Sequence, residues 1–311
     1  MPRTPLFPRG AANALAPLDR APVWLNAEPL TADALAGRVV LVDFWTYSCV
    51  NWLRTLPYVR AWSEKYAENG LTVVGVHAPE FGFEHDLGNV RRAVAGLDVP
   101  YPVVIDNDFG IWRAFDNHYW PAVYLADGTG QVRFHHFGEE AYDRTERAIQ
   151  QLLDVDDHLV DVEAGGVAAP ADWAALRSPE TYVGRLRGTG PSARGAAELA
   201  LNQWALSGKW SVETEFAVLE EGTGAIAFRF EGRDLNLVLT PPAGEAVPFT
   251  VLLDGEPAGE DGGVDVDASG AGVVDEPRMY QLVRQRGPVR PRTFELRLDG
   301  PGARAYVFTF G

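Results

Sequence analysis

The sequence is poor in cysteine and lysine: it has one cysteine, Cys49, and two lysines among 311 residues. A single cysteine cannot form an internal disulfide, so a disulfide-stapled fold is excluded and a reducing compartment is favoured. The formal net charge of -16 predicts a surface that repels phosphates, which argues against nucleic acid and anionic membranes as partners. The length allows one large or two ordinary domains, each with its own core.

Long hydrophobic runs are also missing. No segment approaches about 18 consecutive apolar residues, the length needed to span a bilayer. Residues 1–15 contain arginine and proline but no apolar stretch of signal-peptide length. These absences predict a soluble, cytoplasmic protein without a membrane partner.

Cys49 lies between two segments of different hydrophobic pattern. The preceding residues 38–44 are nearly all apolar, which is typical of a short buried strand. After Cys49, apolar residues recur at helical spacing as far as Trp62, and Gly70 closes the segment as a helix C-cap does. Cys49 is therefore predicted at a helix N-terminus, where the helix dipole favours the nucleophilic thiolate. The alternative is a small buried hydrophobic side chain.

The residues around Cys49 resemble the active-site strand and helix of thioredoxins. The match consists of Val-Asp-Phe-Trp at 42–45, the six-residue step from Asp43 to Cys49, and Pro57, where thioredoxins have a helix-kinking proline. Trp52 stands where the second cysteine of Cys-x-x-Cys belongs, so the dithiol cycle is not implied. The resemblance implies a buried carboxylate at Asp43, acting either as a proton shuttle or in a structural, water-binding role.

Three further residues resemble parts of thiol peroxidases. Thr46 and Cys49 form the Thr-x-x-Cys arrangement of peroxiredoxins, in which the hydroxyl bonds the thiolate and orients peroxide. The stretch 71–84 resembles a glutathione-peroxidase strand and loop, with Glu80 at the active-site glutamine. Trp120 takes the place of that family's active-site tryptophan. A carboxylate at position 80 raises the pKa of a nearby thiol, which opposes peroxide attack unless Glu80 serves as a base.

Pro121 is similar to the cis-proline that thioredoxin-like proteins place opposite the active-site cysteine, where its backbone receives an extended substrate. The alternative is an ordinary proline at the start of a strand. Neighbouring His135 and His136 would point to opposite faces of a strand, so they cannot ligate one ion together. The sequence predicts neither a metal site nor a cofactor.

The order of patterns predicts an α/β thioredoxin-like domain followed by an all-β domain. An irregular lead-in on the surface covers residues 1–22, and strands and helices in the thioredoxin-like order cover 23–155. A linker containing Gly and Pro follows over 156–180. From 181 to 311 apolar residues alternate with polar ones between turn signals, which predicts a jelly-roll-like β-sandwich.

This combination is similar to the soluble C-terminal region of DipZ-type redox proteins, whose β domain resembles a carbohydrate-binding module. The matching motifs lie at 179–184, 202–210 and 306–311. The resemblance implies a glycan as a candidate ligand of the β domain. Trp204 and Trp210 are either a sugar-stacking platform or, as we favour, core aromatics.

Two hypotheses follow. In the first, the protein is a thiol-based oxidoreductase in which Cys49 attacks peroxide or an oxidised protein and is regenerated by an external thiol or thiol protein. The peroxide version is slightly preferred, because an enzyme with one cysteine can turn over that way. In the second, the domain pair is a redox-inactive scaffold that binds a glycan or a protein.

Overall fold

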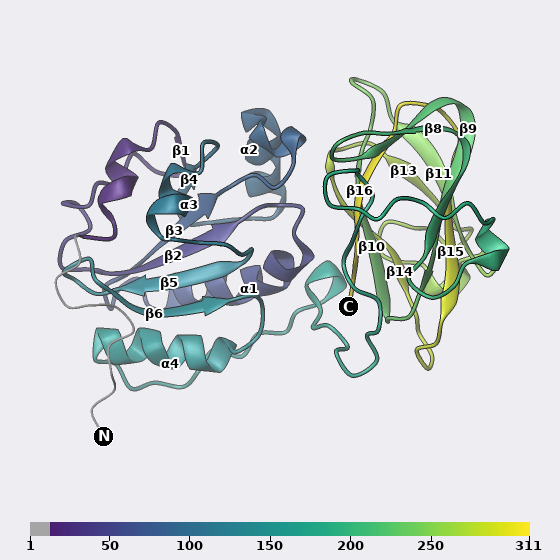
Figure 1. Cartoon of the computed structure of the whole chain (residues 1–311). Coiled ribbons are helices and arrows are strands. Elements are labelled where there is room, and N and C mark those ends of the chain that lie inside the picture. The colour runs from purple at the N-terminus through teal and green to yellow at the C-terminus, as the bar shows by residue number, and fades with distance from the viewer. Residues whose placement is uncertain (1–12) are drawn as a thin grey trace. The chain divides into compact units, whose positions relative to one another are not determined.

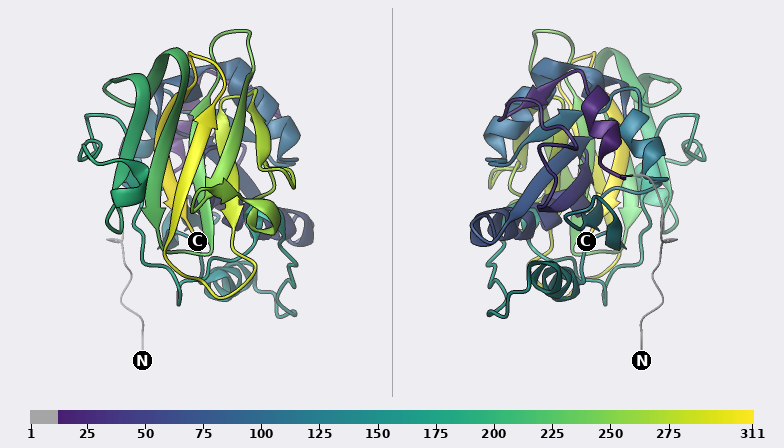
Figure 2. Two further views of the ribbon diagram at one scale, coloured as in Figure 1. Left: turned by 90° about the vertical axis from the view of Figure 1, so that its right-hand side faces the viewer. Right: turned by 90° about the vertical axis from the view of Figure 1, so that its left-hand side faces the viewer.

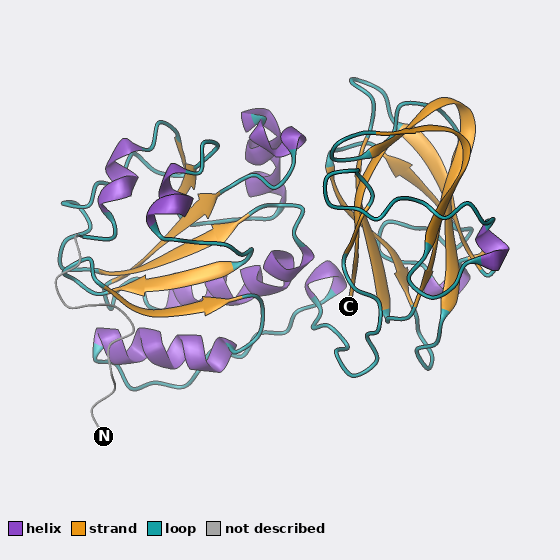
Figure 3. Ribbon diagram, viewed as in Figure 1, coloured by secondary structure: helices purple, strands orange, loops and turns teal. Residues whose placement is uncertain are grey.

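The computed structural model describes residues 13–311, and the chain divides into two compact units, Met1–Ala168 and Ala169–Gly311 (Figure 1). The first unit combines a sheet with helices, and the second consists of strands and short 3-10 helices (Figure 3). This confirms the predicted α/β domain followed by an all-β domain. Within the described residues, no helix has the length and apolar character needed to cross a membrane.

The first unit contains six strands and four α-helices among its described residues. The strands are β1 (Trp24–Leu25), β2 (Val39–Trp45), β3 (Leu71–His77), β4 (Val103–Ile105), β5 (Ala122–Ala126) and β6 (Val132–Phe137). The helices are α1 (Val50–Lys65), α2 (Leu87–Gly96), α3 (Gly110–Ala114) and α4 (Tyr142–Leu153), with 3-10 turns η1 (Ala16–Arg20) and η2 (Gly82–His85).

The sheet places the central strand β2 between β3 and β5. Its strand order is β1-β4-β3-β2-β5-β6, with β2 parallel to β3 and antiparallel to β5. Every residue of β2 is buried, which explains its continuous apolar sequence. Trp45 at the end of β2 lies opposite His77 at the end of β3. The loops that follow these two strands therefore leave the sheet at the same edge.

Helices cover both faces of this sheet: α1 and α4 lie on one face, and α3 and η1 on the other (Figure 3). The second face is closed by an apolar cluster in which Phe44 contacts the rings of Trp112, Phe115 and Tyr124. On the first face, α4 contacts β2 and β6. Because the sheet is covered on both faces, we expect side chains that meet a substrate to lie in the loops that follow its strands.

The predicted irregular surface lead-in over residues 1–22 is wrong for the turn at residues 16–20 and for the buried Leu15 and Leu18, while residues 1–12 lie outside the described part of the chain. Residues 16–20 form the 3-10 turn η1, and Leu15 and Leu18 are both 1% exposed. Three-residue spacing places two leucines on one face of such a turn, and both join the core cluster of the sheet. Their burial holds this Pro-containing segment against the sheet.

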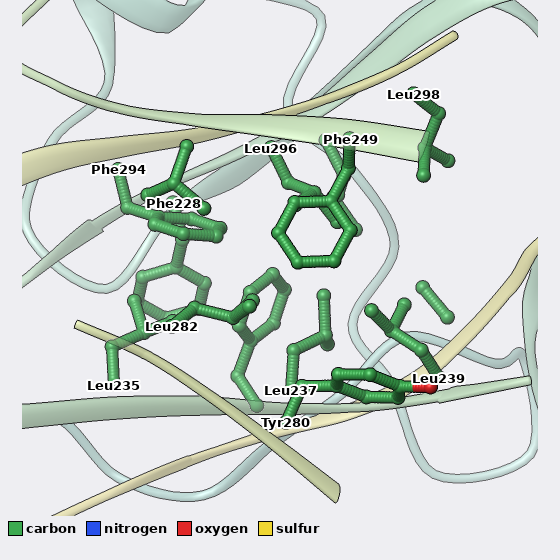
Figure 4. Close-up of a cluster of buried hydrophobic side chains, with 14 of the residues drawn as sticks. Phe228, Leu235, Leu237, Leu239, Phe249, Tyr280, Leu282, Phe294, Leu296 and Leu298 are labelled. Atoms are coloured by element: carbon green, nitrogen blue, oxygen red, sulfur yellow. The ribbon is translucent and has the colours of Figure 1, made fainter. Parts of the chain in front are cut away.

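The second unit has ten strands linked into one sheet. They are β7 (Thr181–Tyr182), β8 (Trp204–Val212), β9 (Ala217–Phe230), β10 (Asp234–Thr240), β11 (Val247–Leu253), β12 (Glu256–Pro257), β13 (Ala271–Val274), β14 (Arg278–Arg284), β15 (Arg292–Leu298) and β16 (Arg304–Phe310). The long strands run side by side in the left view of Figure 2. Strands pass above and below one buried apolar cluster, which includes Phe228, Phe249 and Leu296 (Figure 4). The alternation of apolar and polar residues predicted from the sequence therefore places the apolar side of each strand against a common core.

Gly75 in β3 gives a test of packing in the first unit. A Cβ atom at this position would lie 2.8 Å from Trp45 Nε1 and 3.0 Å from Tyr101 Cε2, both on buried side chains. We expect Gly75→Ala to lower the free energy of unfolding by roughly 1–3 kcal/mol through overpacking, measured by urea denaturation. The matched control is Gly96→Ala at the end of α2, where a Cβ meets no atom within 4 Å. Equal stability of the two variants would contradict this account.

Candidate functional site

Cys49 is the N-cap residue of α1, in the loop that follows β2. Its side chain is partly exposed, and its carbonyl accepts the first helical bond, from Leu53 N. The Sγ atom lies 3.8 Å from the carbonyl oxygen of Trp120. The Trp120–Pro121 peptide bond is cis. The sulfur therefore lies between a helix N-terminus and the loop before β5.

Trp52 points into the interior of the first unit. It is fully buried, its ring stacks on Trp45 with centroids 4.1 Å apart, and its Nε1 donates to Asp43 Oδ2 over 3.0 Å. Tyr101 OH donates to the same oxygen over 3.3 Å, and Asp43 Oδ1 has no hydrogen-bond partner among the described residues. Burial raises the pKa of Asp43 to about 7, and the two donated bonds oppose that rise.

Thr46 and Cys49 are joined through the backbone, because Cys49 N donates to the Thr46 carbonyl over 3.3 Å. The Thr46 side chain is fully buried. Ser48, directly before the cysteine, donates its hydroxyl to Glu84 Oε1 over 2.5 Å. Glu84 is itself fully buried. Burial raises the pKa of Glu84 to about 7, and the bond from Ser48 acts in the opposite direction.

Glu80 and Trp120 are both half-buried and contribute backbone groups to the site's surroundings. Glu80 N donates to Glu84 Oε2 over 2.5 Å, so this residue helps to hold the neighbouring acid. The Trp120 indole donates to the Ala78 carbonyl over 3.0 Å and packs on Trp112. The structure thus brings Thr46, Glu80 and Trp120 together in the loops around Cys49. The Trp120 carbonyl faces Sγ.

His77 is fully buried beside the same loops. Its ring contacts Trp45 edge-on at 4.9 Å and stacks with Tyr47 at 5.7 Å. Neither ring nitrogen has a hydrogen-bond partner among the described residues, and burial lowers the pKa of His77 to about 3. The imidazole is therefore neutral at physiological pH. Over residues 13–311 no group of three or more His, Cys, Asp or Glu side chains is arranged to hold a metal ion.

The two tryptophans of the second unit pack into its core. Trp204 is 2% exposed and belongs to the main apolar cluster. Trp210 is partly buried against that cluster, and its Nε1 donates to the Ser207 carbonyl over 2.9 Å. This agrees with the core alternative for both residues.

Glu84 and Tyr101 are members of the site that the sequence did not single out. Glu84 lies only four residues after Glu80, but it has no periodic or motif signal that separates it from a solvated acid. Tyr101 reaches Asp43 across 58 residues of sequence. Only the pairing of β2 with β3, and of β3 with β4, brings these side chains together.

The comparisons with known proteins agree with this arrangement. A family model described as Redoxin matches residues 14–153, and one described as Thioredoxin like C-terminal domain matches residues 178–311. Thiol-disulfide oxidoreductase YkuV of Bacillus subtilis (strain 168) is 32% identical over 130 residues, which cover 42% of this chain and 87% of YkuV. The fold and these matches define a thioredoxin-like protein, and the chain belongs to the redoxin family through residues 14–153.

Protein DipZ of Mycobacterium tuberculosis (strain CDC 1551 / Oshkosh) is 34% identical over 304 residues, which cover 93% of this chain. The chain is therefore similar to DipZ through both of its units. It spans 41% of the length of DipZ.

The raised pKa of Asp43 predicts a pH-dependent stability. Between its ordinary pKa of 3.8 and about 7, the folded chain keeps a proton that the unfolded chain has lost. This linkage stabilises the fold at low pH and disappears as pH rises through about 7. From about pH 5 to about pH 8 the free energy of unfolding of the wild type should therefore fall by roughly 2 kcal/mol more than that of Asp43→Asn.

Urea denaturation of both proteins at the two pH values measures this difference. Asp143→Asn, which changes an exposed acid in α4, serves as the control and should follow the wild type. Parallel pH trends for the wild type and Asp43→Asn would contradict a protonated, buried Asp43.

Proposed function

We propose that the first unit is a thiol-disulfide oxidoreductase that works with one cysteine, Cys49, and an external thiol. One observation carries this proposal: the partly exposed residue Cys49 occupies the N-cap position of α1 with its Sγ 3.8 Å from the Trp120 carbonyl oxygen, while the residue at the resolving position is buried and bonded to Asp43. A helix N-terminus stabilises a thiolate, which is the form that attacks sulfur. The redoxin family membership and the similarity to YkuV support the same reaction class.

The reaction proceeds by two exchanges. The Cys49 thiolate attacks one sulfur of a substrate disulfide, forms a mixed disulfide and expels the other sulfur as a thiolate, which takes up a proton. A second, external thiolate then attacks the substrate sulfur of the mixed disulfide and releases Cys49 as a thiolate. The substrate disulfide is exchanged for a new one, and Cys49 ends in its starting state.

Trp52 is the reason that the second step needs an external thiol. A cysteine at this position would resolve the mixed disulfide from within the same chain, but the indole fills the position and is fully buried. Its N–H bond to Asp43 also occupies an oxygen of the carboxyl that the thioredoxin resemblance assigns to proton shuttling. We infer a structural role for Asp43 in this chain, as the acceptor that fixes Trp52.

Peroxide is the second candidate oxidant, favoured by the approach of Thr46 to Cys49 in the Thr-x-x-Cys turn. In that version Cys49 becomes a sulfenic acid, water leaves, and two external thiols reduce the sulfenic acid to the thiol. The disulfide version is preferred, because the Thr46 side chain is fully buried and the Trp120 indole N–H is used by Ala78. Pro121 and Glu80 then act by shaping the loops that border the sulfur.

Treatment with oxidised glutathione tests the proposal. We expect intact mass to show one glutathione on the full chain, at Cys49, released by excess reduced glutathione, because no second thiol exists to resolve the adduct. A parallel sample receives hydrogen peroxide and dimedone, a reagent for sulfenic acids. Cys49→Ser is the control and should give no adduct in either sample.

The outcomes separate the hypotheses. A dimedone adduct without a glutathione adduct would replace disulfide exchange by peroxide reduction. Absence of both adducts in the folded wild type would overturn a redox role for Cys49 and leave the binding scaffold, whose ligand would be a glycan or a protein.

A further inference from the structure

Glu84 is the buried acid that connects most directly to the turn carrying Cys49. Its Oε1 accepts the hydroxyl of Ser48, the residue before the cysteine, and its Oε2 accepts the backbone N–H groups of Glu80 and Phe81. We propose that Glu84 is a positioning residue that holds the Cys49 turn against the β3–α2 loop and, through its charge, sets the reactivity of the thiol. This inference rests on the proposed function, because it requires Cys49 to be the reacting group.

The geometry keeps the carboxyl near the sulfur. Adjacent Cα atoms are about 3.8 Å apart, so the Ser48 bond of 2.5 Å places Glu84 Oε1 within roughly 9 Å of the Cys49 Cα. Glu84 is fully buried, and buried charges are screened by salt much less than exposed ones. A negative charge on Glu84 therefore repels a thiolate at Cys49.

The donors around Glu84 suit an anion, but among the described residues no cationic side chain forms an ion pair with it. One hydroxyl and two backbone N–H groups point at its two oxygens. Burial raises the pKa of Glu84 to about 7, so it ionises in the neutral range. Once ionised, it opposes a second negative charge on the neighbouring thiol.

Other titratable groups face the same region. Glu80 lies close enough to raise the pKa of Glu84, and Tyr47, from the turn that carries Cys49, interacts with the Glu84 charge. The remaining charged or titratable groups nearby are His77 at the end of β3, His85 and Asp86 at the end of η2, and Arg92 on α2. Glu84 accepts its hydrogen bond from Ser48, the residue directly before Cys49.

The test is the rate of Cys49 alkylation by iodoacetamide in the full chain, followed from about pH 5 to about pH 9. Glu84→Gln removes the charge and keeps a side chain that can bond both Ser48 and the loop. We expect Glu84→Gln to be alkylated faster, by up to about tenfold, between about pH 7, where Glu84 ionises, and the thiol pKa, and at the wild-type rate near pH 5, where Glu84 is protonated. Ser48→Ala removes one donor that stabilises the anion, so its profile should move the same way by less.

Glu146→Gln is the matched control, because Glu146 is also a buried acid of the first unit. It accepts from Trp62 and Tyr66, and Trp62 lies 13 helical positions beyond Cys49, about 20 Å along α1. Its alkylation profile should match the wild type. Thermal unfolding of every variant confirms that the folded protein is being compared.

Two results are distinguishable. If wild-type Cys49 is alkylated and Glu84→Gln gives the same pH profile as the wild type or Glu146→Gln, the role of Glu84 is overturned while the proposed function stands. If folded wild-type Cys49 is not alkylated at any pH, the proposed function itself fails.

Discussion

The hydrogen bond from Trp52 to Asp43 is the interaction on which the rest of the site depends. It ties the first turn of α1 to the central strand β2, and it satisfies one oxygen of a carboxyl that has no contact with solvent. An unpaired buried carboxylate would be costly. The indole N–H and the Tyr101 hydroxyl together lower the free-energy cost of burying this acid in the core. The same indole fills the position of a resolving thiol and leaves Cys49 as the sole sulfur of the site.

The site is unusual in having two fully buried acids, Asp43 and Glu84, that are held by neutral donors rather than by cations. Burial raises the pKa of both to about 7, and His77 beside them stays neutral. Each acid meets a different part of the Cys49 surroundings: Asp43 contacts the helix through Trp52, and Glu84 contacts the turn through Ser48. Protonation near neutral pH therefore changes the charge around the sulfur.

Much of the fold follows from local sequence pattern. The apolar run before Cys49, the helical spacing after it and the alternation beyond residue 181 correspond to β2, α1 and the strands of the second unit. These signals are strong because each element buries one regular set of side chains. The prediction of a surface lead-in was wrong for Leu15 and Leu18, since their burial depends on a sheet formed by distant residues.

The sequence by itself determined that one cysteine caps a helix after a buried strand, that its usual companion is replaced by Trp52, and that an all-β domain follows. Tertiary structure alone decided that the Trp52 indole turns inward to Asp43, and that Glu84 rather than Glu80 is the buried acid bonded to the turn of Cys49. The physical reason is that periodicity reports which residues are buried along one element. The partner of a buried polar atom depends on which elements become neighbours, and that is settled only when the sheet assembles.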